Sequence, residues 1–227
     1  MIVFRRLIAL GAVAGVVAVG SVSAAPTLVS PGPGSSITSS RPTFTWKLPT
    51  GETGESISVS RSSKINPKTN DFVLADLQDS DILELGATSW KPDRAMPADK
   101  YYWHVASHSD LAKHIFSPIN SFVIKPAITN VKIAVKSYKG QRTFLITSSW
   151  YANERTVTVT EKLFAGAKLL GSHKLATDNF IIDAQKLDIT TWVLPATVKK
   201  GAPLRFVVSL KSKGGAKASL TKTLRAP

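Results

Sequence analysis

The stretch that most constrains the fold is residues 96–107, MPADKYYWHVAS. In a strand, successive side chains point to opposite faces, so Tyr101, Trp103 and Val105 share one face, and Tyr102 and His104 share the other. A tyrosine just after a proline-containing crossing segment is typical of a tyrosine corner, in which its ring is buried and its hydroxyl bonds upstream backbone. We therefore predict that the first set is structural core. Tyr102 and His104 are expected to point to solvent.

Other short alternating runs extend this pattern along the chain. Phe44 and Trp46 alternate with threonines, and similar runs follow near residues 57–59, 131–135 and 204–210. Turn-forming Pro, Gly, Asn and Asp residues separate the runs. Period-2 runs at such spacing predict an all-β chain of two tandem antiparallel β-sandwiches after an N-terminal signal peptide. The joint is expected near KPAITN, residues 125–130, which divides the chain into domains 25–125 and 126–227.

The first of these domains resembles the fibronectin type III-like, or immunoglobulin-like, modules of bacterial exported surface proteins. The matching pieces, in order, are PTLVSPGPG (26–34), FTW (44–46), MPADKYYWHV (96–105), FS (116–117) and FVI (122–124). The second domain matches less well, since Leu204 stands where the corner tyrosine is expected. The resemblance implies adhesion, spacing or ligand-binding roles, and it brings no catalytic residue.

The N-terminus has the pattern of an export signal. Arg5 and Arg6 precede an uncharged apolar run over residues 7–20, and small residues follow at Val22 and Ala24. This order predicts a signal peptide over residues 1–24. The run is shorter than the ~20 residues that a spanning helix needs, so we expect no transmembrane segment in the mature chain. The expected location is extracellular or in the cell envelope.

The net charge of +14 is concentrated in the second half. Residues 25–125 hold ten Lys and Arg and ten Asp and Glu, whereas residues 126–227 hold seventeen and five. Strand parity turns several of these cations outward, and we expect them to share one face. With Tyr102 and His104, the predicted binding residues are Lys132, Lys136, Lys199, Lys200, Arg205, Lys211, Lys213 and Lys217.

This charge asymmetry predicts an anionic partner. Nucleic acid is disfavoured because aromatic residues for base stacking do not interleave with the lysines. An anionic envelope polymer or lipid surface fits better. The alternative partner is a protein or a carbohydrate.

The sequence offers no chemistry-bearing motif. No nucleophile elbow, zinc-protease motif or nucleotide-binding loop is present, and there is no cysteine. His104 and His108 are about 13 Å apart along an extended strand, too far to share a metal ion. We therefore predict no catalytic residue, no metal site and no cofactor, with the four histidines on the surface.

Together these features predict a secreted, non-catalytic binding or adhesion protein held to an anionic envelope polymer or surface by its basic second domain. The alternative is an accessory carbohydrate- or protein-binding module that serves an exported enzyme.

Overall fold

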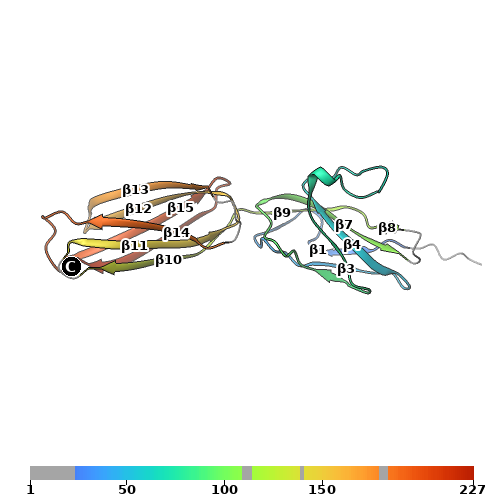
Figure 1. Cartoon of the computed structure of the whole chain (residues 1–227), viewed down its shortest axis with the longest axis horizontal. Coiled ribbons are helices and arrows are strands. Elements are labelled where there is room, and N and C mark those ends of the chain that lie inside the picture. The colour runs from blue at the N-terminus through green and yellow to red at the C-terminus, as the bar shows by residue number, and fades with distance from the viewer. Residues whose placement is uncertain (1–23, 109–113, 139–140, 179–183) are drawn as a thin grey trace, which may run out of the picture.

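The computed structural model describes residues 24–108, 114–138, 141–178 and 184–227. The predicted signal peptide falls almost wholly on residues 1–23, which lie outside this set. The described residues form strands β1 to β16 and one short 3₁₀ turn, η1 (Leu74–Asp76). None of the helices in these residues has the length and apolar character needed to span a membrane. Figure 1 shows two β-sandwiches arranged end to end, which confirms the predicted tandem architecture.

The first sandwich consists of a three-stranded and a six-stranded sheet. The smaller sheet has the order β1-β3-β6, with bounds Thr27–Ser30, Phe44–Lys47 and Ser89–Trp90. The larger has the order β2-β9-β7-β4-β5, with β8 also paired to β7. Its strands are β2 (Ser35–Ile37), β9 (Asn120–Ile124), β7 (Asp99–His108), β4 (Thr53–Ser60), β5 (Leu77–Ile82) and β8 (His114–Phe116). The short β2–β9 pair is parallel, an exception to the expected antiparallel pairing.

The tyrosine corner is present. The Tyr101 hydroxyl donates a hydrogen bond of 2.8 Å to the Pro97 carbonyl, and the ring is fully buried. Trp103 and Val105 are buried on the same face of β7, as the alternation predicts. Phe44 meets the Trp103 ring edge-on at 5.0 Å, so the two sheets are packed through aromatic contacts at the centre of the core.

The second sandwich pairs a three-stranded sheet with a four-stranded one. The first has the order β10-β11-β14, with bounds Ile128–Ser137, Thr143–Ala152 and Lys186–Val193. The second has the order β13-β12-β15-β16, with bounds Lys168–Asp178, Thr156–Ala165, Pro203–Ser212 and Lys217–Arg225. Trp150, Phe206 and Leu163 are among the side chains buried between them.

In the second sandwich, an arginine makes the hydrogen bonds to the backbone that the corner tyrosine makes in the first. Leu204 stands at the expected position and is buried, but it has no hydroxyl to donate. Instead, Nη2 of Arg142 donates to the Pro195 carbonyl at 2.6 Å and also to the Val198 carbonyl. A guanidinium from the residue just before β11 therefore fixes the segment that precedes β15.

A three-residue junction connects the sandwiches, since β9 ends at Ile124 and β10 begins at Ile128. The buried side chain of Asn153 lies beside it: its amide nitrogen donates to the Lys125 carbonyl, and its Oδ1 accepts from the Ala127 N–H. The Asn153 carbonyl accepts from the N–H of Ala98, which belongs to the first sandwich. One residue thus ties the junction to both sandwiches.

Candidate functional site

All eight basic residues proposed from the sequence are exposed, but the prediction that they share one face is wrong. Lys132 and Lys136 lie on β10, in the three-stranded sheet. Arg205, Lys211 and Lys217 lie on β15 and β16, in the opposite sheet, while the other three occupy the turns before and after β15. Parity along one strand predicts whether a side chain is exposed, but not which sheet carries the strand.

The four-stranded sheet gathers part of this charge around a depression of about 640 Å³ on its outer face. Lys174 of β13, Lys211 of β15 and Lys217 of β16 contribute the cations. Hydroxyl groups lie between them, from Thr158 and Thr160 of β12, Ser209 of β15 and Ser219 of β16. Among the described residues that line the depression, none carries a carboxylate.

Strand register determines the spacing of these cations. Lys211 is directly opposite Lys217, and Thr158 is opposite Lys211 on its other side. Lys174 pairs with Thr160 one row further along the sheet. With strands 4.7–4.9 Å apart and about 6.7 Å between rows, the Cα atoms of Lys174 and Lys211 are roughly 12 Å apart. This spacing suits an extended chain of anionic groups better than one small anion.

The Lys211–Lys217 pair costs free energy in the free protein, because like charges directly opposite on neighbouring strands repel. No ion pair to Lys174, Lys211 or Lys217 is found among the residues that the structure describes. An anionic group placed between Lys211 and Lys217 would remove this repulsion, and the hydroxyls could donate hydrogen bonds to it.

Other predicted cations already contact aromatic rings. The guanidinium of Arg205 lies 4.4 Å from the centre of the Phe164 ring. The ammonium of Lys136 lies 5.4 Å from that of Tyr138. Lys213 lines a separate depression between the sandwiches, together with Arg61, Glu154 and others. These residues are therefore less available to a polymer than the three lysines of the four-stranded sheet.

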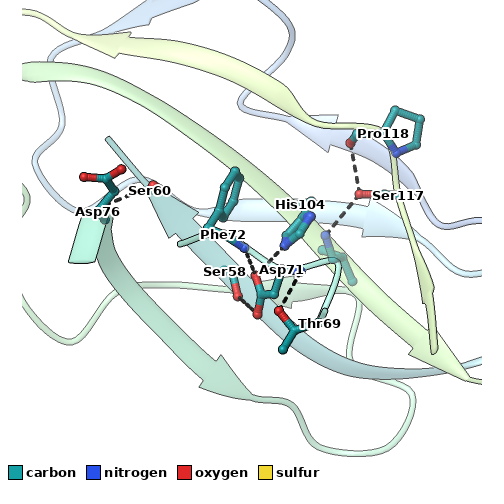
Figure 2. Close-up of polar contacts among 10 residues, drawn as sticks. Ser58, Ser60, Thr69, Asp71, Phe72, Asp76, His104, Ser117 and Pro118 are labelled. Atoms are coloured by element: carbon teal, nitrogen blue, oxygen red, sulfur yellow. Dashed lines mark hydrogen bonds and ion pairs between the residues drawn. The ribbon is translucent and has the colours of Figure 1, made fainter. Parts of the chain in front are cut away.

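The prediction that His104 is exposed is wrong. Its side chain does point to the outer face of the six-stranded sheet, but the segment after β4 folds over it and leaves it 2% exposed. Nε2 of His104 lies 2.8 Å from Oδ1 of Asp71, beside Phe72 (Figure 2). The imidazole ring packs against the rings of Phe72 and Phe116. His104 therefore holds this segment to the sheet and is not accessible to a ligand as placed.

Asp71 is the polar centre of this cluster. Burial raises the pKa of its carboxyl, but hydrogen bonds from His104, from the Phe72 N–H and from the Ser58 hydroxyl outweigh burial, so the pKa is lowered overall. Ser58 and Asp71 are drawn beside His104 in Figure 2. Tyr102, the other residue expected to be outward, is half-buried, and the Lys100 ammonium lies 5.0 Å from the centre of its ring.

The sequence analysis missed a second cluster. Glu161 of β12, His173 of β13 and Asp188 of β14 place one donor atom each within 4.8 Å of one another. His173 is half-buried, not a plain surface histidine. The three residues come from two sheets, with no motif spacing in the sequence. Only the facing of the two sheets brings them together.

No protein-family model and no curated protein matches the sequence. Solved structures similar to the chain include a two-domain fibronectin type III segment of chicken tenascin. It is 12% identical, with a TM-score of 0.45, and the similarity covers 88% of this chain and 99% of that one. The chicken interferon gamma receptor alpha chain is 11% identical, with a TM-score of 0.41, over 90% and 99% of the two chains.

Similarities of this size transfer neither ligand nor activity. The strand pairing and the tyrosine corner define the class, that of tandem fibronectin type III-like β-sandwiches.

Proposed function

We propose that the protein is a secreted, non-catalytic binding protein that attaches to an anionic polymer of the cell envelope through the depression on its four-stranded sheet. In this proposal, residues 25–125 form a neutral domain that is presented outward, and residues 126–227 form the basic attachment domain.

The observation that carries the proposal is the set of three lysines and four hydroxyl-bearing residues around one depression, whose described lining residues include no carboxylate. The spacing of the lysines along the sheet suits an extended ligand better than a single small anion. Lysine supplies point charges without the planar bidentate geometry of arginine, which suits attraction to a polymer of repeating phosphate or carboxylate groups.

The test is binding of the purified protein to isolated envelopes, to polyphosphate and to a polymer of carboxylate sugars, across a salt series. We expect binding to weaken with salt because surface charges are screened. The double variant Lys211→Gln/Lys217→Gln should bind roughly 2- to 30-fold more weakly, since each exposed charge contact contributes ~0.2–1 kcal/mol.

A matched control removes the same charge elsewhere. Lys199→Gln/Lys200→Gln alters the turn before β15, about 27 Å along the strand from Lys211. It should retain near wild-type binding. Equal losses in both double variants would mean that net charge, and not the depression, determines binding. A binding affinity that does not change with salt concentration would contradict the electrostatic account.

A second candidate function is that of an accessory module for an exported enzyme. One feature favours a protein partner: Leu187, Ile189 and Val193 on the outer face of edge strand β14 are 59%, 60% and 71% exposed. Exposed apolar side chains in a row on an edge strand suit protein contact. In this case Leu187→Ser/Ile189→Ser would abolish capture of the partner enzyme, and Lys211→Gln/Lys217→Gln would not.

A further inference from the structure

Glu161, His173 and Asp188 gather at one side of the second sandwich, where the sheets face each other along edge strands β13 and β14. Nδ1 of His173 lies 3.8 Å from Oε2 of Glu161 and 3.7 Å from Oδ2 of Asp188. Glu161 points inward from β12, while Asp188 points inward from the opposite sheet. The cluster therefore spans the interior between the sheets.

Both carboxylates are removed from water. Glu161 is fully buried and Asp188 is 7% exposed. Glu161 accepts hydrogen bonds of 2.6 Å from the Ser148 and Thr190 hydroxyls. In contrast, Oδ2 of Asp188 is buried and has no hydrogen-bond partner among the residues that the structure describes, and it is the atom directed at His173. Burying such an oxygen is costly unless a cation or a donor satisfies it.

A protonated His173 is a poor candidate for that cation. Charge-assisted N–H···O bonds are about 2.7–2.9 Å long, and both distances from Nδ1 are well beyond that range. The His104–Asp71 pair in the same chain does reach 2.8 Å. The three donor atoms lie within 4.8 Å of one another, and none of them is hydrogen-bonded to another, so one metal ion could bind all three.

We propose that Glu161, His173 and Asp188 form a binding site for a divalent transition-metal ion, with Zn²⁺ as the best match to one imidazole and two carboxylates. Donor atoms around a tetrahedral zinc ion with bonds of about 2.0–2.1 Å are about 3.3–3.4 Å apart. The two distances from His173 exceed this separation by only roughly 0.4 Å, which small side-chain rotations remove.

The surroundings supply what such a site needs. The Ser148 and Thr190 hydroxyls orient the Glu161 carboxylate from the opposite sheet, as supporting residues do in metal sites. The His173 side chain is 40% exposed, so the ion has a path in from solvent. Three protein ligands leave the fourth position of a tetrahedral ion to water. A bound ion would cross-link the two sheets at the side away from β10 and β16.

Close to the cluster in sequence, Gly171 of β13 packs against the Trp192 ring of β14. A Cβ atom at Gly171 would lie 2.7 Å from the Trp192 ring. Gly171 precedes His173 by two residues, and Trp192 follows Thr190 by two, so this contact holds the ligand-bearing segments at their observed separation.

The experiment uses the purified protein without a polyhistidine tag, after removal of metal with a chelator. Isothermal titration with Zn²⁺ should give one site per chain, and added Zn²⁺ should raise the melting temperature of the second sandwich. Co²⁺ should give the visible absorption of a tetrahedral site. His173→Ala and Asp188→Asn should each weaken Zn²⁺ binding by more than the roughly 10- to 100-fold that loss of a supporting residue costs.

The control is His114→Ala, since His114 also contacts a carboxylate, Glu55, but lies in the first sandwich. It should bind Zn²⁺ as the wild type does. Wild-type protein that binds no Zn²⁺, Co²⁺ or Mn²⁺ would overturn the proposal. Zn²⁺ binding that survives both His173→Ala and Asp188→Asn would overturn it as well. His173→Ala changes a partly exposed residue, so it remains informative if Asp188→Asn does not fold.

Discussion

Replacing Tyr101 by Phe tests whether the corner hydroxyl stabilises the first sandwich. The change keeps the buried ring and removes one hydroxyl, whose 2.8 Å bond to Pro97 is then lost. The Pro97 carbonyl is left without this donor. Loss of one partner from a buried hydrogen bond costs about 1–3 kcal/mol. The melting temperature of that sandwich should fall by about 4–8 °C for each kcal/mol.

The pH dependence of this cost gives an independent check. Burial raises the pKa of Tyr101 to about 12, from 10.0 for a free tyrosine. Between these values the unfolded chain releases its proton first, so the folded state is stabilised fully below pH 10 and loses that stabilisation as the pH rises toward 12. The loss is roughly 1.4 kcal/mol per pH unit. The Phe variant has no such group, so its deficit relative to wild type should shrink across this range.

The assay is scanning calorimetry from pH 8 to pH 12. Hydrogen exchange at neutral pH assigns the transitions, with peptides from β7 and β15 reporting on the two sandwiches. Tyr102→Phe is the matched control, because this neighbouring hydroxyl lies on a half-buried side chain on the other face of the strand. Its effect should stay within about 0.5 kcal/mol. An unchanged transition in Tyr101→Phe, or a deficit that stays constant from pH 9 to pH 12, would refute the reasoning.

Three further variants test other parts of the structure. Asp71→Asn should be less stable than the wild type at neutral pH, and the difference in unfolding free energy should shrink in acid. The lowered pKa of Asp71 stabilises the fold above about pH 3.8, and this contribution disappears as the pH falls; acid titration of unfolding measures it. Arg142→Lys keeps the charge but cannot bond both carbonyls before β15, and should cost about 1–2 kcal/mol in urea unfolding. Gly171→Ala should push Trp192 aside and destabilise the second sandwich by about 1–3 kcal/mol, with weaker Zn²⁺ binding by titration, whereas Gly166→Ala, at a β-turn open to solvent, should leave Zn²⁺ binding intact.

The features that could be predicted from the sequence are those set by the order of neighbouring residues along one strand. Alternation alone placed Tyr101 and Trp103 in the core, because the pleat of a strand is a local property. The tandem sandwich fold followed from repeated runs of that kind. The same logic assigned His104 correctly to the outer face, but could not foresee the segment near Phe72 that covers it.

The remaining features depend on register and on the facing of two sheets. Lys211 and Lys217 become direct neighbours only through the pairing of β15 with β16. Glu161 and Asp188 come from opposite sheets, and neither lies in a motif. The local signal of this cluster was a glutamate at the next inward-facing position of a strand that begins with alternating threonine and valine. Its significance emerges only once Asp188 and His173 are seen beside it.

The junction at Asn153 has a mechanical consequence. A flexible tether would let the first sandwich sweep a wide volume around an attached second sandwich, and would dilute it over that volume. Here one side chain bonds to both flanks of the junction, and its backbone carbonyl bonds to Ala98 in the first sandwich. The two sandwiches should therefore reorient together, so that attachment of one to a surface sets both the distance of the other from that surface and its orientation. Asn153 would then stiffen the junction so that the chain acts as a short rigid spacer.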